Sequence, residues 1–128
     1  MPRFFNPKAV CAPASTYSHG VDIPSSARVV MLSGQVAMRP DGTVAEGIEA
    51  QTEQVWNNIR LCLADAGLGI GDIVKITSYL TRPQDLAKFG EVRNRHLGAH
   101  RPTSTLLVIQ ALARPELLVE VEVVAVKE

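Results

Sequence analysis

The strongest constraint on the fold is an alternating run near the C-terminal end, residues 118–126. In a strand every second side chain points to the same face, and here one face is purely aliphatic. That face carries Val119, Val121, Val123 and Ala125. The other face carries Leu118, Glu120, Glu122, Val124 and Val126. Because a solvated face carries more polar side chains than this, the mixed face predicts a subunit interface or the wall of a binding site.

Length and charge indicate one ordinary domain. The 128 residues show no repeat or linker, so we expect a single domain over residues 1–128. Thirteen Lys and Arg balance thirteen Asp and Glu, which argues against a charge-driven association with nucleic acid or an anionic membrane. The first residues lack the apolar core of a signal peptide, and no segment is apolar over a membrane-spanning length. We therefore expect a cytosolic protein.

The metal-ligating residue types are scattered. They are Cys11, Cys62, His19, His96 and His100, and none has a partner at metal-ligand spacing. Cys62 is most simply a small core residue, and the histidines are most simply surface or loop residues. The glycines of the 67–71 segment precede a strand instead of opening a helix, so they do not form a phosphate-binding loop. We expect neither a metal nor a cofactor.

The N-terminal third reads as strands and turns. Residues 1–13 contain three prolines and little periodicity, which predicts an extended lead-in. Residues 17–21 and 28–33 have strand character. The sequence Arg-Pro-Asp-Gly at 39–42 predicts a turn between two paired strands, since proline presets φ and Asp-Gly tolerates positive φ.

The middle of the chain predicts two helices separated by a strand. Apolar residues recur every three or four positions over 47–66, and Gly67 is placed to end this helix. Residues 72–81 are β-branched and alternating. Helical spacing returns over 83–97, where Pro83 suits a first turn and Gly98 follows the last.

This order of elements predicts an α+β domain, a mixed β-sheet with both helices packed on one face. Trp56 lies one position off the apolar stripe of the first helix, which predicts a place at the margin of the core. The second sheet face has nothing of its own to cover it. If that face carries Leu118, Val124 and Val126, the chain should form a homo-oligomer.

Several segments taken together resemble the Rid/YjgF family, the reactive intermediate deaminases. They are Tyr17–Val21, Ser33–Val36, Gln51–Ile59, Asp72–Lys75 and Val119–Ala125. The resemblance implies a chorismate-mutase-like fold of the bacillus type and a homotrimer with small-molecule ligands in clefts between subunits. It also implies hydrolysis of enamines and imines that pyridoxal-phosphate enzymes release.

The resemblance also assigns roles to individual residues. Tyr17 matches the tyrosine that closes the cleft, and Gly34 matches the glycine whose backbone approaches the ligand. Glu120 matches the acid of the final strand. Tyrosine is also common at strand edges and interfaces, and Gly34 could simply allow a strand bulge, so structural roles stay open for both.

Two family positions are not matched. Deaminases of the family hold the substrate carboxylate with an arginine at the start of the penultimate strand. That position is Thr105 when counted back from Val119 and Ser104 when counted forward from Pro102. Gly90 replaces an asparagine common in the second helix. These departures argue against the usual imino-acid deamination, because a hydroxyl cannot supply the charge that anchors a carboxylate.

The chemistry itself points to Glu120. Imine hydrolysis needs a water and a group that exchanges protons, and a carboxylate among aliphatic side chains takes up a proton more readily than one in water. Glu120 and Glu122 could instead be satisfied at an interface. Arg101 lies four residues before Thr105 and either reaches the cleft or stays solvated.

Three functions fit these observations. The first is a hydrolase of small imines, enamines or related reactive metabolites, and the second is a non-catalytic ligand-binding or regulatory homotrimer. The third, a ribonuclease or translation inhibitor, follows names given to some relatives. The zero net charge and the lack of a histidine pair count against the third.

Overall fold

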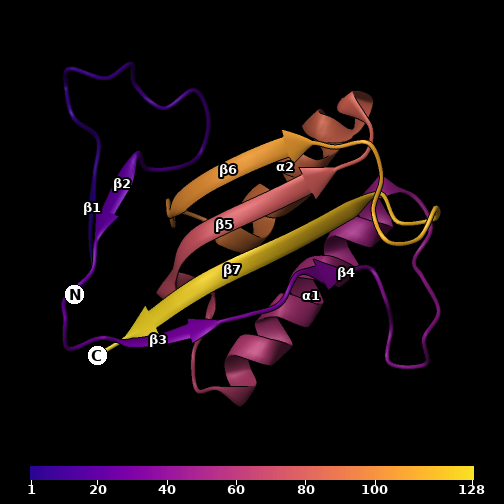
Figure 1. Ribbon diagram of the computed structural model, residues 1–128, viewed down its shortest axis with the longest axis horizontal. Coiled ribbons are helices and arrows are strands. Elements are labelled where there is room, and N and C mark those ends of the chain that lie inside the picture. Colours follow the sequence, from indigo (N-terminus) through magenta and orange to yellow (C-terminus); the bar gives the residue numbers. More distant parts are fainter.

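The chain forms one mixed sheet with two helices on one face (Figure 1). The computed structural model describes all residues, 1–128. The sheet strands are β3 (Arg28–Met31), β4 (Gln35–Val36), β5 (Ile73–Leu80), β6 (Thr103–Val108) and β7 (Val119–Lys127). Their order is β3-β7-β5-β6, with β4 also paired to β7, and only β5 and β6 run parallel. The predicted α+β class is confirmed.

Both predicted helices are present. They are α1 (Ile48–Asp65) and α2 (Leu86–Leu97). The 3₁₀ turn η1 (Ile70–Asp72) lies between α1 and β5, and the 3₁₀ turn η2 (Pro83–Asp85) leads into α2. Gly67 and Gly98 follow them with φ of 79° and 57°, a conformation that L side chains rarely adopt. Neither helix is long and apolar enough to cross a membrane.

The core lies between the helices and the inner face of the sheet. The aliphatic face predicted for residues 118–126 is buried, with Val119, Val121 and Ala125 fully inaccessible. It packs with β5 and with the buried stripe of α1, which includes Ile59 and Leu63. Burial of this kind supplies most of the stability of a small domain.

Two predictions about α1 were wrong. Trp56 is fully buried instead of marginal, because the buried stripe is wide enough to include the side that faces α2. Its ring stacks on that of His96, with centroids 6.1 Å apart. Cys62 is only partly buried and lies outside the core cluster.

The N-terminal segment is more ordered than predicted. The extended lead-in predicted for residues 1–13 contains a strand, β1 (Arg3–Phe5), that pairs antiparallel with β2 (Gly20–Asp22). The Phe5 ring lies against Gly20, and a Cβ there would lie 2.3 Å from the ring, so a larger residue would displace the ring. The strand predicted at 17–21 thus begins later, and Ser18 makes a separate bridge to Thr103.

The turn predicted at residues 39–42 is present. The segments on either side of it form a single β-bridge and no continuous pair of strands. Gly42 N–H donates to the Arg39 carbonyl at 2.9 Å, and Arg39 N–H donates to the Thr43 carbonyl at 2.8 Å. Met38 and Val44 form an isolated antiparallel bridge instead of the two paired strands that were expected.

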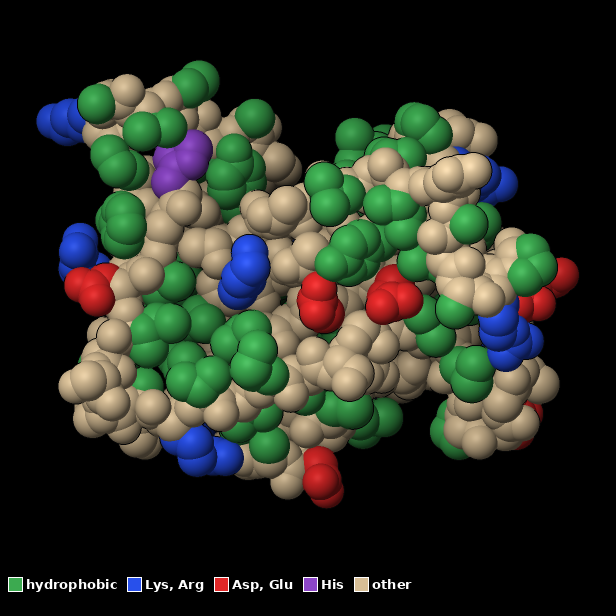
Figure 2. Space-filling model, viewed as in Figure 1, with side chains coloured by type: hydrophobic (Ala, Val, Ile, Leu, Met, Phe, Trp, Pro, Cys, Tyr) green, Lys and Arg blue, Asp and Glu red, His purple; other side chains and the backbone are tan.

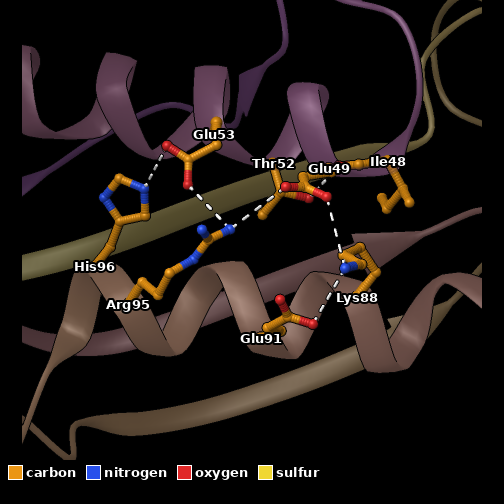
Figure 3. A network of polar contacts seen from close by, with 8 residues as sticks. All are labelled: Ile48, Glu49, Thr52, Glu53, Lys88, Glu91, Arg95 and His96. Carbon is orange, nitrogen blue, oxygen red and sulfur yellow. Dashed lines mark hydrogen bonds and ion pairs between the residues drawn. The ribbon is translucent and has the colours of Figure 1, made fainter.

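Ion pairs join the exposed edges of α1 and α2 (Figure 3). Glu49 lies 3.6 Å from Lys88 and 3.8 Å from Arg95, while Glu53 lies 3.6 Å from Arg95 and 3.3 Å from His96. Exposed pairs contribute at most about 1 kcal/mol each, so the network aligns α2 more than it stabilises the fold.

The sheet face opposite the helices, called the open face below, is uncovered. Figure 2 looks onto it and shows acidic side chains near its middle with hydrophobic side chains around them. Met31 is 75% exposed and Leu107 48% exposed. Glu120 and Glu122 alternate with the buried residues of β7 and are half-buried here.

Candidate functional site

A cavity of about 630 Å³ lies between residues 15–17, α2 and β6. Its apolar wall includes Leu86, Phe89 and Leu106. Its polar lining includes Tyr17, Arg93, Asn94 and Ser104. A mostly apolar cleft of this size with a few polar groups is typical of small-molecule sites.

Hydrogen bonds fix the loop that carries Tyr17. Ser18 N–H donates to the Pro102 carbonyl at 3.1 Å, and its hydroxyl donates to the Arg101 carbonyl at 2.6 Å. On the other side, the Thr16 hydroxyl donates to Asn94 Oδ1 at 2.7 Å. These bonds anchor the loop to both β6 and α2, which places Tyr17 at the cavity.

Arg93 is the residue of this cavity that the sequence did not single out. It is 6% exposed, and its Nη1 donates to Thr16 Oγ1 at 2.8 Å and to Asn94 Oδ1 at 3.2 Å. Burial, with a smaller contribution from the Arg101 charge, lowers the pKa of Arg93 to about 10. The sequence did hold one sign of this burial. Arg93 lies four residues after Phe89 and four before Leu97, which places it on the buried stripe of α2.

Ser104 and Thr105 are the two candidates for the position at which the family's deaminases carry an arginine, and they lie on opposite faces of the sheet. Ser104 pairs with Ile76, a core residue, and lines the cavity. Thr105 is exposed and shares a row of the open face with Thr77 and Glu122. Of these two residues, Ser104 therefore faces the cavity and Thr105 does not.

Arg101 does not line the cavity. Its Nη1 donates to the Gly98 carbonyl at 2.6 Å and to the His100 carbonyl at 2.9 Å, beside the C-terminal end of α2. Gly90 does line it, but a Cβ there would meet nothing within 4 Å. Close packing does not require this glycine.

Glu120 lies on the open face, next to Gly34. A Cβ on Gly34 would come within 2.0 Å of Glu120 Oε2. The neighbouring Glu122 accepts a hydrogen bond from the Tyr79 hydroxyl at 2.8 Å, and this bond is the main cause that raises the pKa of Tyr79. No side chain or backbone group of the chain donates to Glu120. Its carboxylate is thus free to bind a water or a ligand.

The sequence-predicted residues therefore form two groups. Tyr17 and Ser104 lie at the cavity on the helix side of the sheet. Glu120 and Gly34 lie together on the open face. Within one chain the sheet separates them, so one chain does not bring all four to a single ligand.

No part of the chain gathers three or more His, Cys, Asp or Glu side chains that could hold a metal. The potential ligand chemistry is that of hydrogen-bond donors, one buried cation and the carboxylate of Glu120. Such groups suit the recognition of a small polar molecule and proton transfer to or from it.

Comparisons with known proteins agree with this architecture. The family model described as Endoribonuclease L-PSP matches residues 8–127. A RutC family protein of Pyrococcus abyssi is 31% identical over 91% of this chain and 90% of its own length. A Salmonella typhimurium protein named 2-iminobutanoate/2-iminopropanoate deaminase is 33% identical over 91% of this chain and 92% of its own.

Solved structures give the same result. A Yersinia pestis protein of unknown function from the conserved Rid family superposes with a TM-score of 0.85 at 32% identity, covering 97% of both chains. The chain therefore belongs to the Endoribonuclease L-PSP family, the Rid/YjgF family that its sequence resembles.

Proposed function

We propose that this protein hydrolyses small imines or enamines, releasing ammonia, at clefts between copies of the chain in a homotrimer. The observation that carries the proposal is the carboxylate of Glu120. It lies against Gly34 on the open face and accepts no hydrogen bond from its own chain. A relative 33% identical to the chain is named for the deamination of two short 2-imino acids.

The reaction assigns Glu120 a proton-transfer role. Water adds to the imine carbon and forms a C–O bond, while the carboxylate accepts a proton from that water. The carboxylate returns this proton to the imine nitrogen, which gives a tetrahedral carbinolamine, and the hydroxyl proton of the carbinolamine passes to the nitrogen as the carbinolamine collapses. The C–N bond then breaks, ammonia leaves, and a ketone remains. A carboxylate that accepts no hydrogen bond from its own chain has free oxygens for this exchange.

The homotrimer is part of the proposal, and two observations support it. The open face exposes Met31, Val29 and Leu107, which a partner would cover. Furthermore, Glu120 and the cavity lie on opposite sides of the sheet, so a second copy is needed to place both beside one ligand. Cytosolic location stays a prediction from the sequence.

The experiment is the release of ammonia and oxo acid from freshly enzyme-generated imino acids. The wild type is compared with Glu120→Ala and with buffer, and sedimentation checks that both proteins keep the same assembly. The proposal expects release above buffer that Glu120→Ala removes. Ammonia release by Glu120→Ala equal to that of wild type would remove Glu120 from the mechanism. Release at the buffer rate by the wild type would reject the hydrolase.

A second candidate is a non-catalytic ligand-binding trimer. It is favoured by Ser104, a neutral residue that lines the cavity and is one of the two positions at which the family resemblance implies an arginine in deaminases. Saturable binding of a small metabolite without any turnover would support this function. A ribonuclease is the third candidate, following the family's description, and degradation of RNA by the pure protein would test it.

A further inference from the structure

We propose that Arg93 binds the carboxylate group of a short-chain substrate in the cavity between residues 15–17, α2 and β6. Arg93 would thereby replace, from the helix, the cation that the strand lacks at Ser104. This inference rests on the proposed hydrolase and narrows its substrate class to small carboxylates. Four features of Arg93 support it.

The first feature is that most N–H donors of the Arg93 guanidinium have no partner in the protein. A guanidinium offers five N–H groups, and only Nη1 of Arg93 donates to the protein, to Thr16 and Asn94. Nε and Nη2 have no protein partner. They are not among the fully buried unpaired atoms, which are Trp56 Nε1 and Ser78 Oγ. Nε and Nη2 therefore border accessible space, and the cavity is the space that Arg93 lines.

The second feature is charge. Arg93 is nine-tenths buried and has no carboxylate within ion-pair distance, whereas Arg82, for example, pairs with Asp85 at 2.8 Å. The acid in the cavity lining, Glu91, lies 3.2 Å from Lys88. A buried cation without an anion is costly, and an incoming carboxylate would offset that cost. The lowered pKa of Arg93 expresses the same burial and still leaves the group charged at neutral pH.

The third feature is orientation. Nη1 donates to the Thr16 carbonyl at 3.3 Å and to the Thr16 hydroxyl at 2.8 Å, and the same hydroxyl donates to Asn94 Oδ1 at 2.7 Å. These neutral partners fix the guanidinium without neutralising it. The edge formed by Nε and Nη2 is the edge that pairs with a carboxylate through two parallel bonds.

The fourth feature is the shape of the site. The apolar side chains of Leu86, Phe89 and Leu106 border the same cavity, which suits an aliphatic body attached to the carboxylate. The hydroxyls of Tyr17 and Ser104 add neutral hydrogen-bonding groups. A short 2-imino or 2-oxo acid matches this combination.

Calorimetric binding of 2-oxobutanoate tests the inference, with its neutral methyl ester as the comparison ligand. The wild type should bind the acid at least about tenfold more tightly than the ester, as expected for charge-assisted hydrogen bonds. Arg93→Gln should remove this preference, and Arg93→Lys should restore part of it. Arg95→Gln is the matched control, because Arg95 lies on the same helix, is 54% exposed and pairs with α1.

A second measurement observes Arg93 directly in the wild-type protein. The Arg93 Nε–H signal of wild-type protein, identified by its loss in Arg93→Lys, should shift in NMR spectra on titration with the acid and not with the ester. Equal binding of acid and ester, unchanged binding by a folded Arg93→Gln, or no binding at millimolar concentration would overturn the inference. Arg93-dependent binding without ammonia release would instead reject the hydrolase alone. Ammonia release that is unchanged in Arg93→Gln would reject the role of Arg93 alone.

Discussion

The Gly34 backbone lies directly against the Glu120 carboxylate, so that a Cβ on Gly34 would come within 2.0 Å of Glu120 Oε2. Gly34 directly precedes β4, which pairs with β7 in a register that places Val36 opposite Glu120. The position of this carboxylate on the open face thus depends on a residue without a side chain.

Substituting Gly34→Ala should displace the carboxylate and spare the fold. The obstructed atoms are the flexible end of a glutamate, so we expect an unfolding free energy within about 1 kcal/mol of wild type. Ammonia release should fall about ten- to hundredfold, as for a misplaced catalytic group. Gly71→Ala is the control, because a Cβ there meets nothing within 4 Å. A full rate in Gly34→Ala would show that the position of Glu120 does not matter.

Carboxylate binding at Arg93 should depend on pH in one direction. Burial lowers the pKa of Arg93 to about 10, so the guanidinium is charged at neutral pH and loses its proton as pH rises through that value. Affinity for 2-oxobutanoate should stay constant near neutrality and decrease above about pH 10. Calorimetry across this range checks it, and the same titration on Tyr17→Phe excludes the phenol in the cavity lining as the source. Constant affinity through the whole range would contradict the role of Arg93.

Tyr79 should titrate above the usual range for tyrosine. The hydrogen bond to Glu122 and partial burial both favour the neutral phenol and raise its pKa. Subtracting the ultraviolet titration of Tyr79→Phe from that of wild type isolates this group. Replacing the charged acceptor with a neutral amide in Glu122→Gln should move the midpoint back towards that of an ordinary tyrosine. If Glu122→Gln left the midpoint unchanged, the hydrogen bond would not be its cause.

The two leucines of α1 provide a matched test of the core. Leu63 is fully buried, whereas Leu61 is 53% exposed on the same helix. Leu63→Ala should lower the unfolding free energy by about 2–5 kcal/mol, and Leu61→Ala by less than about 0.5 kcal/mol. Denaturant unfolding at one protein concentration measures both. Equal losses would mean that the Leu61 side is also buried, for instance in the assembled protein.

The sequence predicted the elements whose patterns are local. The alternation of residues 118–126 and the helical stripe before Gly67 correspond to β7 and α1 within a few residues. The pairing of β1 with β2 was missed, because a three-residue strand far from its partner has no periodicity to read. Trp56 was misplaced because the width of a buried stripe depends on the second helix.

The candidate site was predicted less completely. Counting along the chain left Ser104 and Thr105 as alternatives, and a shift of one residue in a strand exchanges its two faces. Only the register with β5 shows that Ser104 faces the cavity. Arg93 was not predicted because a charged residue on a helix is normally solvated, and its burial depends on the loop that carries Thr16.

The most direct test of the proposed hydrolase is the rate of ammonia release from a freshly generated 2-imino acid, measured on wild type, Glu120→Gln and Arg95→Gln together. Glu120→Gln keeps the shape of the side chain and removes its capacity to accept a proton. The account predicts release above buffer for wild type and Arg95→Gln, and release at the buffer rate for Glu120→Gln. Release at the buffer rate by wild type, or undiminished release by Glu120→Gln, would contradict it.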